Sequence, residues 1–153
     1  MTIRRANAED VPGIVGLYKA DPVTGLREAE GVEAEEGYAE AFRVIDRDEN
    51  QRLMVAEEEA GALTGTVQVT LIVHVMAQGL RRAVVEAMFV HPEYQGKGIG
   101  GALMQAAIAQ AREWGCGAVE LTSNKVRKEA HAFYGRLGFV ATHEGFKLGL
   151  GKG

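Results

Sequence analysis

The sequence has little cysteine and no long apolar run. Cys116 is the only cysteine among the 153 residues, so no intramolecular disulfide can form, and a reducing cytoplasm is the predicted location. The most apolar run, Val69 to Ala77, is far too short to span a bilayer and contains His74. Residues 1–10 are too polar for a secretory signal peptide. These absences exclude a disulfide scaffold and predict no membrane partner.

Basic tracts, repeats and low-complexity segments are also absent. The net charge is −4 without a polybasic stretch, which argues against a nucleic-acid partner. The histidines lack metal-ligand spacing, so no metal is predicted at His74, His91, His131 or His143. With 46% hydrophobic and 25% charged residues, the composition is typical of one globular domain over residues 1–153, large enough to bury its own core.

The spacing of apolar residues predicts an alternation of strands and helices. The predicted strands are 2–6, 53–58, 64–76, 82–90, 118–122, 139–142 and 146–150, and the predicted helices are 11–18, 27–46 (one or two helices), 99–114 and 128–137. Asp10 is the predicted N-cap of the first helix. This order indicates a mixed α/β domain with one mostly antiparallel sheet of about six to seven strands, flanked by about four helices.

A glycine-rich turn joins an apolar strand to a helix in residues 84–104. Its glycines are Gly96, Gly98, Gly100 and Gly101. Without a Cβ they let the backbone bend sharply and approach a ligand. The helix that begins near Ile99 leaves its first N–H groups unpaired and carries partial positive charge at that end. The turn therefore predicts an anion site suited to a pyrophosphate.

A nicotinamide dinucleotide is one cofactor that fits such a turn. Residues 96–101 match G-x-G-x-x-G, and Glu120 lies near the expected position of a ribose-binding acid. Against this, residues 91–95 separate the strand from the first glycine, a hairpin meander precedes the turn, and one βα repeat follows it. A P-loop nucleotide triphosphatase is excluded because G-x-x-x-x-G-K-[ST] is absent.

A second pattern covers more of the chain. Gln95-x-x-Gly98-x-Gly100, after an apolar strand and at a helix start, resembles the acyl-CoA pyrophosphate loop of the GNAT-type N-acetyltransferase superfamily. Residues 130–139 are similar to the family's later A-x-x-F-Y-x-x-x-G-F segment. The element order also matches, most weakly in residues 20–50. The resemblance implies the acyl-CoA N-acyltransferase fold, in which two neighbouring strands, here 82–90 and 118–122, splay apart.

The resemblance implies acetyl-CoA as the cosubstrate, bound between the splayed strands. The backbone of Met88, Phe89 and Val90 would pair with the pantetheine arm as an added strand does. The pyrophosphate would lie on Gln95, Gly96, Lys97, Gly98, Ile99 and Gly100. Lys97 would offset phosphate charge or remain a solvated turn lysine. Asn124 would hydrogen-bond the pantetheine, or serve only as a turn residue.

The implied reaction is direct attack of a neutral primary amine on the thioester. An alkyl ammonium with a pKa near ~10 must first lose a proton, and the backbone around Met88 would supply an N–H to the oxyanion. Tyr134 matches the family position that protonates the departing thiolate, with a core tyrosine as the alternative. A non-catalytic acyl-CoA-binding or sensing module is the alternative function. A homodimer through the terminal strands is possible by family analogy.

Glu86 is the predicted base. It is the one charge in the apolar run 83–90 and shares a strand face with Met88 and Val90 if the strand alternates regularly. Burial there would raise the carboxyl's affinity for protons toward a useful range. The alternative is a hydrogen-bonded carboxylate that shapes the pocket. His74 is a weaker candidate for substrate contact, because a satisfied histidine on the sheet is favoured.

An acidic run lies where the family builds its variable acceptor-binding wall. Its members are Glu28, Glu30, Glu33, Glu35, Glu36 and Glu40. A cationic amine would be drawn to such a surface, although a solvated helix face is the plainer interpretation. Tyr18 either lines the same site or packs in the core. Small amines, amino acids, aminoglycoside-like compounds and protein amino groups all stay open as acceptors.

Overall fold

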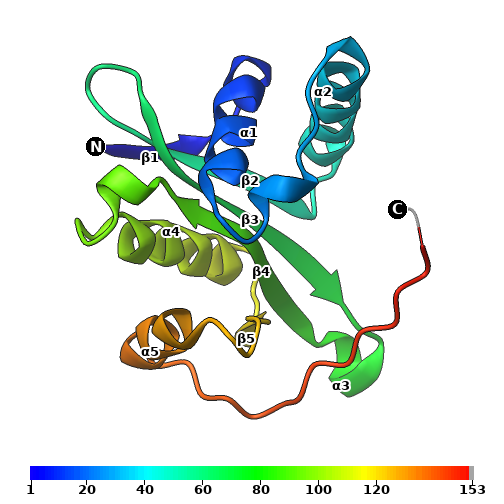
Figure 1. The fold of residues 1–153 in the computed structure, drawn as a ribbon. Helices are drawn as coiled ribbons and strands as arrows, with labels where there is room; N and C mark the ends of the chain where they lie inside the picture. The colour runs from blue at the N-terminus through cyan, green and yellow to red at the C-terminus, as the bar shows by residue number, and fades with distance from the viewer. Residues whose placement is uncertain (152–153) are drawn as a thin grey trace. The chain divides into compact units, whose positions relative to one another are not determined.

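The computed structural model describes residues 1–151 (Figure 1). The chain divides into two compact units, Met1–Leu121 and a smaller one that begins at Thr122. A single domain over residues 1–153 stays a prediction.

The first unit contains one five-stranded sheet, in the order β1-β2-β3-β4-β5. Its strands are β1 (Thr2–Arg5), β2 (Gln51–Glu57), β3 (Leu63–Val73), β4 (Arg81–Val90) and β5 (Ala118–Leu121). Its helices are α1 (Val11–Ala20), α2 (Val32–Arg47), the one-turn α3 (Met76–Gly79) and α4 (Ile99–Glu113), with short 3-10 helices at Ala8–Asp10, Gly25–Arg27 and Pro92–Tyr94. β1 to β4 pair antiparallel, and β4 pairs parallel with β5. The predicted mixed α/β fold with a mostly antiparallel sheet is confirmed.

The sheet has a helical layer on each face. Because side chains alternate between the faces of a strand, Leu53 and Val55 of β2 point to the α1–α2 side, where they pack with Ile14 and Phe42. The other face packs on α4. There Gly65 of β3 lies so close to α4 that an added Cβ would come within 2.8 Å of the Leu103 side chain.

Gly65→Ala is therefore expected to lower the free energy of unfolding by about 2 kcal/mol, because the new methyl group overpacks the α4 interface. It would also meet the Phe89 carbonyl oxygen at 3.0 Å, which cannot move without disturbing β4. The matched control is Gly37→Ala on α2, where an added Cβ meets nothing within 4 Å. That change is expected to raise stability by about 0.5–1 kcal/mol. Denaturant unfolding measures both, and equal effects would contradict the close packing.

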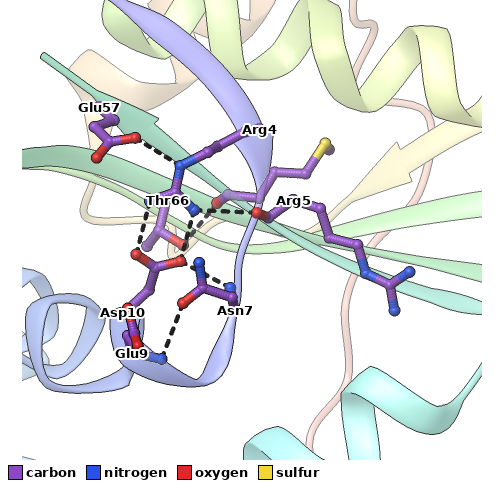
Figure 2. A network of polar contacts seen from close by, with 8 residues as sticks. Arg4, Arg5, Asn7, Glu9, Asp10, Glu57 and Thr66 are labelled. Carbon is purple, nitrogen blue, oxygen red and sulfur yellow. Dashed lines mark hydrogen bonds and ion pairs between the residues drawn. The ribbon is translucent and has the colours of Figure 1, made fainter. Parts of the chain in front are cut away.

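An ion-pair network fixes the start of α1 against the sheet (Figure 2). The Arg4 guanidinium donates to both carboxylate oxygens of Asp10, at 2.7 and 2.8 Å, and to Glu57 at 2.6 Å. Asp10 also accepts from the Asn7 backbone N–H, at 2.7 Å, while the Asn7 side chain accepts from Glu9 N–H, at 2.9 Å. Asp10 makes no side-chain cap bond to α1. Asp10 is therefore the N-cap residue of α1 by position, as predicted, but its side chain does not cap this helix, and Asn7 caps the preceding 3-10 turn.

The Arg4 hydrogen bonds hold the pKa of the buried Asp10 carboxyl below its ordinary value. A group whose pKa is lowered in the folded state stabilises the fold above its unfolded pKa, about 4, and loses that contribution as the pH falls. Asp10→Asn is expected to lower the free energy of unfolding by about 2 kcal/mol at neutral pH. The deficit should shrink toward pH ~3.

Thermal unfolding over that pH range measures the effect. Asp46→Asn is the control, because its ion pair with Arg5 is about half exposed (48% for each side chain) and should contribute about 0.5 kcal/mol or less. A deficit in Asp10→Asn that does not change with pH would contradict the role given to Arg4.

The second unit contains one helix, α5 (Lys128–Arg136), as predicted. The two strands predicted at 139–142 and 146–150 are wrong, because the described residues after α5 form no strand. The alternating side chains of Phe146, Leu148 and Leu150 are 96%, 84% and 90% exposed. An alternating pattern becomes a strand only where a neighbouring strand completes its hydrogen bonds and covers its apolar face. The sheet of the described structure accordingly has five strands rather than six or seven.

Candidate functional site

β4 has an open edge over its second half. β5 pairs with β4 only from Arg82 to Val85, whereas β4 continues to Val90 and pairs with β3 along its other edge. Within the described part of the chain, no strand lies along the second edge of residues 86–90. Alternate backbone N–H and C=O groups of that edge are thus available to an extended ligand.

A β-bulge interrupts β4 inside this segment. Ala87 and Met88 together lie opposite the single residue Val67 of β3, where the register shifts. Ala87 has a φ of 48°, a left-handed conformation that is uncommon for a residue with a side chain. The bulge inserts one extra residue into β4 relative to β3. Every β4 side chain after it therefore lies on the opposite face from the one that regular alternation predicts.

The structure corrects two predictions about Glu86, its strand face and its burial. Glu86 pairs with Gln68 and Phe89 pairs with Thr66, and residues 66 and 68 share one face of β3, so Glu86 shares its face with Phe89 and not with Met88. Glu86 is also exposed rather than buried. The burial that would have prepared it as a base is absent. The remaining support for Glu86 as a base is its position, on the α1–α2 side of the sheet at the start of the open edge.

The glycine loop follows β4 after the short 3-10 helix Pro92–Tyr94 and leads into α4. Gly96 and Gly98 have φ angles of 78° and 85°, which favour glycine because a Cβ would be strained there. Gly98 is the N-cap of α4 and offers no side chain to its first N–H groups. A Cβ at either glycine would meet nothing within 4 Å. The exposed N–H groups and the helix dipole together form the anion-binding arrangement that the motif predicts.

Two side chains of the loop contact its own framework. The Gln95 amide donates to the carbonyl oxygen of Val90, at 3.2 Å, and so ties the loop to the end of β4. The Lys97 ammonium lies 4.8 Å from the centre of the Tyr94 ring, a cation–π contact. Lys97 is therefore held beside the loop instead of extending freely into solvent. Tyr94 was missed in the sequence, where the only signal is an aromatic residue three positions before a loop lysine.

An aromatic pair lies on the α1–α2 side of β4. The rings of Tyr18 and Phe89 meet edge to face with centroids 5.0 Å apart. Burial, with a smaller contribution from the charge of Glu28, raises the pKa of Tyr18 to about 12. The Tyr18 hydroxyl thus stays protonated at neutral pH. Tyr18 both packs against β4 and lies near a carboxylate, so the two interpretations left open by the sequence are compatible.

Within the acidic run, one glutamate differs from the others. Glu28 is half-buried and accepts a short hydrogen bond from the Tyr38 hydroxyl, whose oxygen in turn accepts from the Ala29 backbone N–H at 3.1 Å. The other five glutamates of the run are exposed. A solvated helix face is thus the correct description for the four on α2, Glu33, Glu35, Glu36 and Glu40, whereas Glu30 and Glu28 lie in the loop before that helix.

Two predicted site residues belong to the second unit. Tyr134 on α5 is half-buried against Phe133 and Phe139, with ring centroids 5.3 and 6.0 Å apart. Burial raises the pKa of the Tyr134 hydroxyl, partly offset by the charge of Arg127. Asn124 accepts from the backbone N–H of Val126, at 3.1 Å, which is the turn contact of the plainer interpretation.

Comparison with known proteins identifies the family. Residues 16–139 match the model of the acetyltransferase (GNAT) family. The chain belongs to this family. Mycothiol acetyltransferase from Propionibacterium freudenreichii is 34% identical over 96 residues, which are 61% of this chain and 30% of that protein. The chain thus matches under a third of the length of this curated relative.

Solved structures support the GNAT fold over nearly the whole chain. A transcriptional regulator from Bacillus halodurans C-125 is 36% identical, with a TM-score of 0.91, and the match covers 97% of this chain and 99% of that one. An acetyltransferase from Clostridium acetobutylicum with acetyl-CoA has a TM-score of 0.74 at 19% identity, over 97% and 96% of the two chains. The second likeness concerns the fold alone.

Other polar groups of this GNAT chain lie outside the β4 edge. His74 follows β3, and its Nε2 atom is buried without a hydrogen-bond partner among the described residues, so the prediction of a satisfied histidine is wrong. Among residues 1–151, no three His, Cys, Asp or Glu side chains are grouped so as to hold a metal ion. None of the described helices has the length and apolar character that crossing a membrane requires.

Proposed function

We propose that the chain is an N-acetyltransferase that transfers the acetyl group of acetyl-CoA to a primary amine. The observation that carries the proposal is that the glycine loop is tied to the end of the open edge of β4, since the Gln95 amide donates to the carbonyl oxygen of Val90 and the loop leads into the N-terminus of α4. A strand edge suits the amides of a pantetheine arm, and a helix N-terminus suits a pyrophosphate. Family membership adds acetyl-CoA as the donor that GNAT proteins use.

The residues present fit this ligand. The backbone of Met88, Phe89 and Val90 would hold the pantetheine, with a Met88 N–H also available to the developing oxyanion. The loop from Gln95 to Gly100 would hold the pyrophosphate, with Lys97 adding positive charge from its position beside Tyr94.

Direct attack by the amine is favoured over a covalent cysteine intermediate. Cys116 is the only thiol in the sequence, and burial raises its pKa, with Arg81 opposing part of the shift. A thiol nucleophile acts as the thiolate, which a raised pKa disfavours. Direct attack requires a ternary complex of protein, acetyl-CoA and amine. A reduced Cys116 is consistent with the predicted cytoplasmic location.

Two proton transfers complete the reaction. The incoming ammonium must lose a proton, and Glu86, at the start of the open edge and in contact with solvent, would accept it directly or through a water. The leaving thiolate must gain one. Tyr134 would supply it, because the raised pKa of its hydroxyl keeps the phenol protonated at neutral pH.

A panel of primary amines with acetyl-CoA tests the function. Free thiol and the mass of the acetylated product are followed together, with NADH titrated in parallel as a competing cofactor. We expect thiol release that depends on both the protein and an amine, and no binding of NADH. Acetyl-CoA binding without release of thiol with any amine would instead indicate a non-catalytic acyl-CoA-binding module.

A further inference from the structure

Two glutamates on the α1–α2 side of the sheet lack a cationic partner. Some acids of the first unit bind arginines, as Asp10 and Glu57 bind Arg4. The Glu28 carboxylate instead has a neutral partner, the Tyr38 hydroxyl. Glu86 forms neither an ion pair nor a side-chain hydrogen bond with any described residue. Both carboxylates therefore keep their negative charge available to a ligand.

The aromatic pair connects these two carboxylates. Glu86 lies on the same face of the sheet as Phe89, as the register beyond the bulge requires. The Phe89 ring contacts the Tyr18 ring. The turn that leads to Glu28 packs against the end of α1, the helix that carries Tyr18, because the Glu28 N–H donates to the Gly25 carbonyl oxygen at 3.2 Å and an added Cβ at Gly25 would meet the Lys19 carbonyl oxygen at 2.5 Å. The Tyr18 hydroxyl has no hydrogen-bond partner among the described residues. One side of β4 thus presents a carboxylate, two rings, a free hydroxyl and a second carboxylate.

This arrangement suits a ligand with two positive charges. Ring faces attract ammonium groups, and a carboxylate attracts them over a longer range. An acceptor whose reacting nitrogen lies at the open edge near Glu86 would direct its far end along the Phe89 and Tyr18 rings. An anionic group at that end would be repelled, and a neutral one would leave the Glu28 charge without a partner.

We propose that Glu28 is a specificity-determining residue, which selects a diamine over a monoamine or an amino acid as the acetyl acceptor. The inference rests on the proposed acetyl transfer. Tyr38 is a positioning residue, because its hydroxyl holds the Glu28 carboxylate in place. The other glutamates of the run are exposed, and two of them have cationic partners, Glu30 with Lys19 and Glu40 with Arg43.

The test compares three acceptors with the same four-carbon chain, namely putrescine, butylamine and γ-aminobutyrate. They differ at the end away from the reacting amine, which is an ammonium in putrescine, a methyl group in butylamine and a carboxylate in γ-aminobutyrate. We expect kcat/KM to be about ten-fold higher for putrescine than for butylamine, and lower again for γ-aminobutyrate. Glu28→Gln should abolish the preference for putrescine, mainly through KM.

Two further variants test whether the preference depends on the anchored carboxylate of Glu28. Tyr38→Phe should weaken the preference without abolishing it, because the carboxylate remains but is no longer held. Glu36→Gln, an exposed member of the same run on α2, should keep the full preference. Equal kcat/KM for all three acceptors, or a preference that survives in Glu28→Gln, would overturn the inference and leave acetyl transfer standing. No acetylated product from any of the three would instead contradict the proposed function itself.

Discussion

Replacing Tyr134 by phenylalanine is expected to lower kcat by about 100-fold while leaving the Kd for acetyl-CoA nearly unchanged. The change removes only the hydroxyl. The ring stays in the aromatic group with Phe133 and Phe139, so the packing of α5 is kept. The hydroxyl has no hydrogen-bond partner among the described residues, which leaves it available to protonate the departing thiolate.

The pH dependence separates a proton donor from a structural tyrosine. Burial raises the pKa of the Tyr134 hydroxyl, so the donor stays protonated at neutral pH and its deprotonation limits the rate only at strongly alkaline pH. In Tyr134→Phe, kcat should be lower, and its decrease at alkaline pH should disappear. Glu129→Gln, an exposed change on the same helix, is the control and should leave both intact. A native rate and pH profile in Tyr134→Phe would remove the role.

The second large effect is expected in the glycine loop. Gly98→Ala should raise the Kd for acetyl-CoA by about five- to thirty-fold. The φ of 85° at this position costs a residue with a side chain about 1–2 kcal/mol, which corresponds to that range in an equilibrium constant. The loop is expected to relax away from the conformation in which the first N–H groups of α4 face a pyrophosphate.

Gly101→Ala is the matched control for this change. Gly101 lies within α4, has ordinary helical backbone angles and has nothing within 4 Å of an added Cβ. Alanine there should bind acetyl-CoA as the native protein does and should raise stability by about 0.5–1 kcal/mol. Calorimetric titration measures both variants. A native Kd in Gly98→Ala would show that the loop does not hold the phosphates.

The elements up to residue 122 follow directly from local patterns. Period-two alternation gave the strands, and the glycines after β4 marked the loop and the start of α4, because each signal lies within a few neighbouring residues. The bulge at Ala87 has no such signal, since an alanine at positive φ looks like any strand residue. That one extra residue moved Glu86 to the face of Phe89 and away from Met88.

Contacts between distant residues account for the other differences. The strands expected at 139–142 and 146–150 had the right alternation, but alternation specifies a strand only where a neighbour pairs with it. Six glutamates between residues 28 and 40 look alike in the sequence. Only the fold distinguishes Glu28, through the Tyr38 hydroxyl ten residues away on α2.

Transfer of an isotopically labelled acetyl group tests the central claim most directly. The protein is mixed with labelled acetyl-CoA and a primary amine, and mass spectrometry follows the label while free thiol is measured in the same sample. The account predicts that the label appears in an amide on the amine, in the same amount as the thiol released, and that neither forms without the protein. Release of thiol with no labelled amide, or retention of all the label on CoA, would contradict it.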